Sequence, residues 1–202
     1  MFVFSYENII DPLLRDVRRT VAGLSGLNSG DRVLDVCCGT GAQVFEYGKR
    51  GFIAAGIDVN PQMFRKASRK QKKGRLDNVS FYLGDAVNLP FADDSFHCAC
   101  LSFGLHDKVQ EQRYRIVSEM KRVVKKDGVL VFVDYNVPLP KNVWGKLATT
   151  IEFLVGGTHY MGFKNYLRSG GLVNVFNKCH LRQDYKDNII SGLGVIVRAR
   201  VP

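Results

Sequence analysis

Short β-branched runs alternate with amphipathic segments through most of this chain, and few folds are compatible with that alternation. Strands are predicted over residues 32–36, 52–57, 79–83, 96–103 and 129–133. Between them, apolar residues recur at helical spacing. Strands separated by helices pair in parallel through right-handed crossovers. The sequence therefore predicts an α/β protein with a doubly wound sheet.

The helix boundaries carry recognisable signals. Asp11-Pro12 is typical of an N-cap followed by proline, so an amphipathic helix is expected to start there. Further helices are expected over 42–49, after Asn60-Pro61 and around 116–124. Beyond Pro138 the signals weaken. Helices are predicted there over 143–155 and 166–176, followed by a closing antiparallel pair at 189–190 and 195–201.

Composition narrows the class of protein further. The 202 residues, 46% hydrophobic and 24% charged, fit one globular domain rather than a fibre or a disordered chain. The chain shows neither a bilayer-length apolar run nor a secretory signal, so a cytoplasmic protein is expected. Five cysteines, with Cys37 and Cys38 adjacent, suit reduced thiols. The chain has no C-x-x-C pair, and no metal site is expected.

Three predicted strand ends carry residues suited to a nucleoside. Residues 35–41, Asp-Val-Cys-Cys-Gly-Thr-Gly, lead from the first strand into a helix whose free N–H groups favour an anionic group. Asp58 ends the second strand, where a carboxylate can accept both ribose hydroxyls. Asp85, in Gly84-Asp85-Ala86, can accept a hydrogen bond from an adenine amino group. These positions predict an adenosine-type ligand.

The loop leaves more than one interpretation open. A dinucleotide fingerprint aligned on Gly39 and Gly41 requires a third glycine where this chain has Val44. That departure disfavours a NAD-dependent oxidoreductase, which stays as the alternative enzyme. A plain tight turn without a ligand is the structural alternative.

These stretches resemble the class I S-adenosylmethionine-dependent methyltransferases, particularly the C-methyltransferases of ubiquinone and menaquinone biosynthesis. The matching stretches are VLDVCCGTG (33–41), GIDVN (56–60), GDA with LPF (84–91), DSF (94–96), SFGL (102–105) and RVVKKDG (122–128). The resemblance implies a Rossmann-like, mostly parallel seven-stranded sheet with an antiparallel C-terminal strand. It also implies an S-adenosyl-L-methionine-dependent methyltransferase that acts on a small-molecule acceptor.

The resemblance carries cofactor roles to individual residues. It implies that Asp35 and the backbone of Cys37, Cys38, Gly39, Thr40 and Gly41 lie near the methionine part, and that Ser102 and Phe103 follow the methionine side. It also implies that Asp58 binds the ribose and that Val59 and Met63 lie beside adenine. Asp85 is expected at the adenine amino group, and Gly84 and Ala86 beside it are expected to contact the cofactor. Cys37 stands where the family often has glycine, so the local backbone must tolerate a Cβ. The chain is expected to form one domain, with an N-terminal helical cap (1–27), a cofactor-binding core (28–135) and an acceptor-side lid with a closing hairpin (136–202).

Methyl transfer is an in-line displacement that needs no nucleophile on the protein. A general base can still be needed, and the candidates are His106, which follows the fourth strand, and His159 with Tyr160. A polar surface position is the alternative for each histidine. Aromatic residues between 144 and 166 fall where this family builds its acceptor lid, and they suit a quinone-type or other lipophilic aromatic acceptor. Ordinary core packing is the alternative for these aromatics.

The net charge of +10 comes from 29 basic and 19 acidic residues. Basic runs at 65–75 and 121–126 could contact RNA phosphates or an anionic membrane surface. Neither run has interleaved aromatic residues for base stacking, which favours a solvated helix face over a nucleic-acid site. An RNA-binding or RNA-methylating protein on the same fold stays as a further alternative. The sequence does not indicate an oligomeric state.

Overall fold

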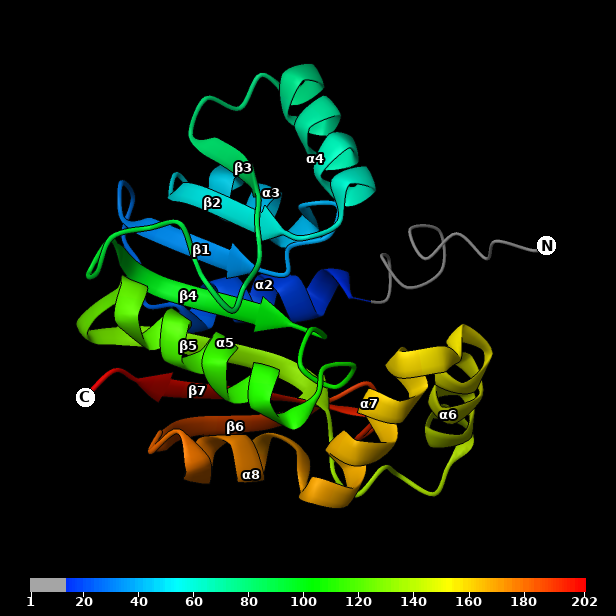
Figure 1. Cartoon of the computed structure of the whole chain (residues 1–202). Coiled ribbons are helices and arrows are strands. Elements are labelled where there is room, and N and C mark those ends of the chain that lie inside the picture. Colours follow the sequence, from blue (N-terminus) through cyan, green and yellow to red (C-terminus); the bar gives the residue numbers. More distant parts are fainter. Residues whose placement is uncertain (1–13) are drawn as a thin grey trace.

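A computed structural model describes residues 14–202 of the chain (Figure 1). The predicted start of the first helix at Asp11-Pro12 lies outside the described residues. Within them, α2 (Arg15–Leu24) is the first helix, and its Val21 and Ala22 are buried. The central feature is one twisted sheet with helices on both faces.

Seven strands form this sheet in the order β3-β2-β1-β4-β5-β7-β6. They are β1 (Arg32–Val36), β2 (Ile53–Asp58), β3 (Val79–Leu83), β4 (Phe96–Ser102), β5 (Val124–Tyr135), β6 (Gln183–Ile189) and β7 (Gly194–Arg200). Every pair among β1 to β5 is parallel, whereas β7 runs antiparallel to both β5 and β6. The predicted fold class, a mostly parallel seven-stranded sheet with an antiparallel C-terminal strand, is confirmed.

The remaining helices are α3 (Ala42–Lys49), α4 (Pro61–Gly74), α5 (Gln110–Val123), α6 (Val143–Val155), α7 (Gly157–Ser169) and α8 (Gly171–Lys178). The predicted cap of α4 is present, since the Asn60 side chain accepts a hydrogen bond from the Gln62 N–H and Pro61 follows it. Figure 1 shows α6 and α7 together beyond the carboxyl ends of the parallel strands. These two helices therefore lie at the end of the sheet where such folds bind ligands.

Alternation along the strands builds two separate cores. Val33 of β1 packs with residues of α2 and α3, whereas Leu34 and Val36 pack with α5 and α8. Cys98 and Cys100 point to the α2–α3 face and are fully buried, as small apolar residues of a strand core are. Both faces are covered, as a parallel sheet requires.

The predicted helix over 166–176 is wrong, because the chain breaks there. Gly170 ends α7 with φ +92°, and Gly171 follows with φ +61°. Both values lie in the left-handed region that a side chain disfavours, and a Cβ on Gly171 would also lie 2.6 Å from Val137 Cγ2. Two helices, α7 and α8, replace the single predicted one.

Two strands also differ clearly from the prediction. β5 begins at Val124 rather than 129, so Val124 leaves the predicted helix. The first strand of the closing pair is Gln183–Ile189 rather than 189–190. β6 lies at the sheet edge and is mostly exposed, so its polar residues gave no hydrophobic signal. No helix in the described part of the chain has the length and apolar character needed to cross a bilayer.

Candidate functional site

The carboxyl ends of β2 and β4, and the segments after β1 and β3, enclose a cavity of about 440 Å³. This volume is typical of small-molecule sites. Several predicted cofactor residues line it, namely Cys37, Asp58, Val59, Met63, Gly84, Asp85, Ala86 and Phe103. The tertiary structure thus brings residues from four separate loops to one space.

The loop after β1 is tightly folded. Cys37, Gly39 and Gly41 have φ values of +58°, +54° and +79°. The backbone of Cys37 therefore has a left-handed conformation although the residue has a Cβ, which is the tolerance that the sequence predicted. A Cβ on Gly41 would lie 2.5 Å from the Phe81 ring, so close packing as well as conformation demands glycine there.

Asp58 links two of the cavity loops. One of its carboxylate oxygens, Oδ2, accepts a hydrogen bond from the Gly39 N–H at 2.8 Å, and Oδ1 accepts one from the Asn60 N–H at 2.8 Å. A carboxylate has about four acceptor sites, so Asp58 can still accept hydrogen bonds from a ligand. Asp85, after β3, is exposed and accepts a hydrogen bond from the Val87 N–H at 3.1 Å. Both acids therefore offer acceptor atoms at neighbouring strand ends.

Asp35 differs from these two acids because it is buried within the sheet. Burial, followed by the nearby charge of Asp58, raises the pKa of Asp35 to about 8. Its side chain does not belong to the described lining of the cavity. The same holds for Cys38, Gly39, Thr40, Gly41 and Ser102. The cofactor roles of these six residues stay predictions, as do those of the residues that line the cavity.

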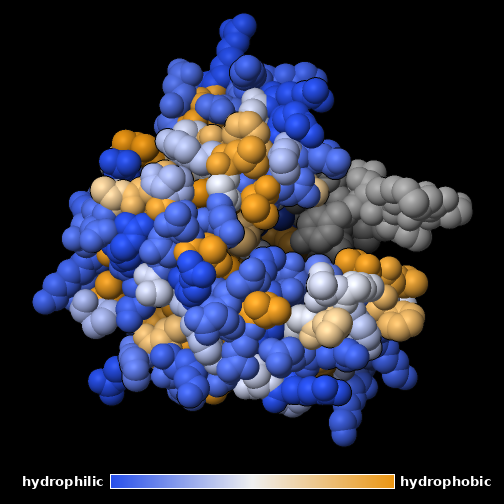
Figure 2. Space-filling view, in the orientation of Figure 1, coloured by the Kyte–Doolittle hydropathy of each residue, from blue (hydrophilic) through white to orange (hydrophobic). Residues whose placement is uncertain are grey.

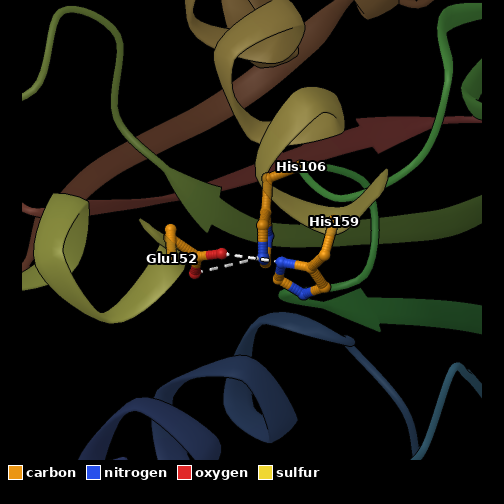
Figure 3. A group of neighbouring side chains, drawn as sticks. All are labelled: His106, Glu152 and His159. Carbon is orange, nitrogen blue, oxygen red and sulfur yellow. Dashed lines mark ion pairs between the residues drawn. The ribbon is translucent and has the colours of Figure 1, made fainter. Parts of the chain in front are cut away.

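A cluster of two histidines and three carboxylates lies beside this cavity. Figure 3 shows His106, His159 and Glu152 of this cluster. The Nδ1 atom of His106 lies 2.8 Å from Asp134 Oδ1, and its Nε2 atom lies 3.6 Å from Glu152 Oε1. His159 Nδ1 lies 2.9 Å from Glu152 Oε2, and its Nε2 atom lies 3.6 Å from Asp107 Oδ2. Asp107 also lines the cavity. The structure therefore brings together the two histidines that the sequence proposed as bases.

The carboxylates change the acid–base properties of His106. Burial lowers the pKa of this histidine, but the charge and hydrogen bond of Asp134, together with the charges of Glu152 and Asp107, more than offset burial. The pKa of His106 consequently lies above its ordinary value of 6.5. His106 is thus a stronger proton acceptor than free imidazole.

Tyr160 lies on the aromatic side of this region. Its ring stacks on Phe163 with centroids 6.4 Å apart, and the Lys164 ammonium lies 4.7 Å from its centroid. Tyr135 packs edge-on against both His106 and Phe103, with ring centroids 4.8 and 5.7 Å apart. Aromatic rings therefore surround the cluster on the side of α7, although the role of Tyr160 as a base stays a prediction.

Sequence reasoning missed several residues of the site. Glu152 and Asp134 belong to the histidine cluster, and Lys108 and Gln112 line the cavity. Arg113 is fully buried and donates hydrogen bonds to the carbonyls of Leu105 and Gly162, so it connects α5 to α7. A signal for Arg113 was present, because it falls on the helix face that carries 116, 117 and 120.

Comparison with known proteins agrees with this architecture. Residues 33–128 match the family model described as a methyltransferase domain. A demethylmenaquinone methyltransferase of Paenarthrobacter aurescens is 37% identical over 130 residues, which cover 63% of this chain and 49% of that relative. One from Desulfitobacterium hafniense is 29% identical over 196 residues, covering 86% of this chain and 74% of that relative. The chain spans about half the length of the first relatives that it matches.

The fold has close counterparts among solved structures. A SAM-dependent methyltransferase from Aquifex aeolicus aligns with a TM-score of 0.68 at 20% identity, covering 92% of this chain and 89% of the other. The strand order, the glycine loop after β1 and the acid that ends β2 agree with the resemblance to class I S-adenosylmethionine-dependent methyltransferases, and the match of residues 33–128 to a methyltransferase domain supports it. Within the class, its sequence is similar to the demethylmenaquinone methyltransferases named above.

Proposed function

We propose that this chain transfers a methyl group from S-adenosylmethionine to a small, lipophilic aromatic acceptor that carries an ionisable hydroxyl, as a quinol does. One observation carries the proposal: the same cavity is lined by Asp58 and Asp85, which suit a nucleoside, and by Asp107. Asp107 in turn contacts His159 of the histidine cluster. Donor and acceptor can therefore meet within one space. The similarity to demethylmenaquinone methyltransferases supports the choice of acceptor class.

The residues of the cavity fit the cofactor. Asp58 is placed to accept hydrogen bonds from ribose hydroxyls, and Asp85 is placed to accept one from an adenine amino group. Val59 and Met63 offer apolar contact to the adenine ring. When bound, S-adenosylmethionine supplies a methyl group on a positively charged sulfur. The contribution of the chain is to hold that group in line with the acceptor and to exclude water.

The histidine cluster suits the acceptor hydroxyl. His106 is buried and backed by Asp134, which fixes the ring and strengthens its basicity. Glu152 and His159 present further acceptor atoms beside it. The Nε2 atom of His106, when it carries no proton, can accept the proton of such a hydroxyl and leave the more nucleophilic oxyanion.

A lipophilic acceptor also fits the surface around α6. This helix exposes Val143, Leu147, Ile151 and Leu154 at helical spacing, and Leu154 is 75% exposed. Figure 2 shows hydrophobic residues gathered over the α6 and α7 region. We propose that this apolar face contacts the surface of a membrane that holds the acceptor, with the net charge of +10 favouring anionic lipid.

Ligand-induced stabilisation tests the cofactor. S-adenosylhomocysteine should raise the melting temperature of the protein, whereas NAD and RNA should not, because only a ligand that binds the folded state stabilises it. A shift with NAD alone would favour the oxidoreductase. Incubation with radiolabelled S-adenosylmethionine should then label demethylated quinols and leave RNA unlabelled, and label in RNA alone would contradict the acceptor class.

Sedimentation with vesicles tests the membrane contact. The wild-type protein should sediment with anionic vesicles at low salt, and the double variant Leu147→Ser/Leu154→Ser should lose most of this binding. Val173→Ser removes an equally apolar exposed side chain from α8 and is the matched control. Equal binding by both variants would mean that α6 does not carry the contact.

A further inference from the structure

We propose that His106, Glu152 and His159 form a binding site for one divalent transition-metal ion such as Zn²⁺. One donor atom from each residue can be chosen so that all three lie within 4.8 Å of one another (Figure 3). Two imidazole nitrogens and one carboxylate form a donor set that zinc accepts in sites with an open fourth position. Donors around zinc lie about 3.4 Å apart at bond lengths near 2.1 Å, so small side-chain rotations complete the site.

The three residues come from different elements and are held at one point. His106 follows β4, Glu152 lies in the last turn of α6, and His159 lies in the first turn of α7. Gly156, with φ +70°, separates the two helices and lets Glu152 and His159 face each other. The side chains of His106 and Glu152 are only 6% and 5% exposed, so bulk water does not compete freely for them.

Each proposed ligand has a partner on its far side. Asp134 lies 2.8 Å from His106 Nδ1, which leaves Nε2 directed at the cluster. Asp107 lies 3.6 Å from His159 Nε2, and the Tyr135 hydroxyl donates a 2.8 Å hydrogen bond to Glu152 Oε1. Metal-binding histidines and carboxylates are commonly oriented by such outer hydrogen bonds. The same arrangement sets the tautomer of each ring for metal binding.

The centre of the cluster also contains unmet polar atoms. Glu152 Oε2 and His159 Nδ1 are buried and lie 2.9 Å apart, but neither has a well-directed hydrogen bond among the described residues. Leaving such atoms unpaired is costly in a buried place. A cation between them would satisfy both, because a carboxylate oxygen and an imidazole nitrogen each offer it a lone pair.

The position of the site gives the ion a role, which rests on the proposed methyl transfer. Asp107 joins the cluster to the cavity, so an ion held by His106, Glu152 and His159 would lie at the acceptor side. A hydroxyl bound at its open position has a lowered pKa and ionises near neutral pH, releasing its proton to water. The metal would thus activate the acceptor in place of a free histidine base.

Spectroscopy with Co²⁺ tests the site without requiring activity. The full chain is dialysed against a chelator and titrated with Co²⁺. We expect one equivalent to bind with visible d–d bands, and Zn²⁺ to displace it. His159→Phe and Glu152→Gln should each weaken Co²⁺ binding by at least about tenfold, and Tyr135→Phe should weaken it by about tenfold through the outer hydrogen bond. His180→Asn removes an exposed imidazole elsewhere and should change nothing.

Folding and cofactor binding are followed in the same samples. Circular dichroism and S-adenosylhomocysteine affinity should be unchanged in His159→Phe, whose site is partly exposed. Equal Co²⁺ affinity in wild type and in both ligand variants would overturn the proposal, as would a thiolate-to-cobalt band that disappears when the cysteines are alkylated. If the wild type does not bind S-adenosylhomocysteine, the proposed function is contradicted instead. Failure of the metal site and failure of the proposed function are therefore distinguishable.

Discussion

Replacing Asp35 by Asn should stabilise the protein in a strongly pH-dependent way. Asp35 is buried beneath the loop after β1, and its pKa is raised from 3.8 to about 8, first by burial and then by the charge of Asp58. A hydrogen bond with Cys100 and the charge of Arg18 lower it only in part. The folded protein therefore holds a proton on Asp35 at pH values where the unfolded chain has released it.

The sign and size of the effect follow from proton linkage. A carboxyl with a raised pKa stabilises the fold fully below pH 3.8, and this contribution is lost as the pH rises toward 8. The loss is about 1.4 kcal/mol per pH unit, or about 4 kcal/mol between pH 3.8 and pH 7. Asparagine has nearly the shape of the protonated acid and carries no such penalty. Asp35→Asn and wild type should therefore be similar in stability at pH 4 and differ by about 4 kcal/mol at pH 7.

Urea unfolding between pH 4 and pH 8 measures this difference. Asp77→Asn removes an exposed carboxylate elsewhere and serves as the control for the general effect of one charge. The slopes of the urea transitions should be unchanged, so that midpoints report stability directly. Calorimetry with S-adenosylhomocysteine completes the test, and weaker binding by Asp35→Asn is expected if the acid contacts the methionine part.

Parallel pH profiles for wild type and Asp35→Asn would refute this reasoning. That outcome would mean that Asp35 is ionised in the folded protein despite its burial. A gain in stability together with unchanged S-adenosylhomocysteine affinity would keep the electrostatic argument and remove Asp35 from the cofactor site. The two measurements therefore separate its structural effect from its binding role.

Three further perturbations test the site. Asp58→Ala should weaken S-adenosylhomocysteine binding by about 1–3 kcal/mol in calorimetry, since it removes the anchor of the Gly39 N–H and the proposed acceptor for the ribose; unchanged affinity would place the ribose elsewhere. Gly41→Ala should cost about 1–3 kcal/mol in urea unfolding, more than Gly192→Ala, because both have positive φ but only Gly41 meets the Phe81 ring; equal losses would contradict the clash. Arg113→Met should reduce stability by about 3 kcal/mol and lower amide exchange protection in α7, because it leaves the carbonyls of Leu105 and Gly162 unpaired; normal protection of α7 would show that Arg113 does not anchor it.

Local patterns in the sequence were sufficient for the cofactor half of the molecule. The β-branched runs predicted the parallel strands, because β1, β4 and the second half of β5 are buried on both faces and are therefore mostly apolar. Asp58 and Asp85 could be placed from sequence alone, since the carboxyl ends of neighbouring parallel strands meet at one edge. The same reasoning led to the cavity that both acids line.

The C-terminal third was harder to predict, for two physical reasons. β6 is an exposed edge strand and carries polar residues on both sides, so it lacks the alternation that marks a half-buried strand. The break at Gly170 interrupts a segment whose apolar residues continue at helical spacing on both sides. At β6 the pairing with β7 sets the structure, whereas at 170–171 two consecutive glycines allow the left-handed break.

The amino-acid order by itself predicted the parallel strands, the positions of Asp58 and Asp85 at the cavity and the resemblance to methyltransferases, because those features depend on short-range patterns at each strand end. Only the tertiary structure decided that His106, Glu152 and His159 converge. They come from a loop and two helices, and no local spacing reports their distance in space. Burial also depends on the tertiary structure. It removes water from Asp35 and so raises the pKa of that residue, and it leaves Glu152 Oε2 and His159 Nδ1 without hydrogen-bond partners within residues 14–202.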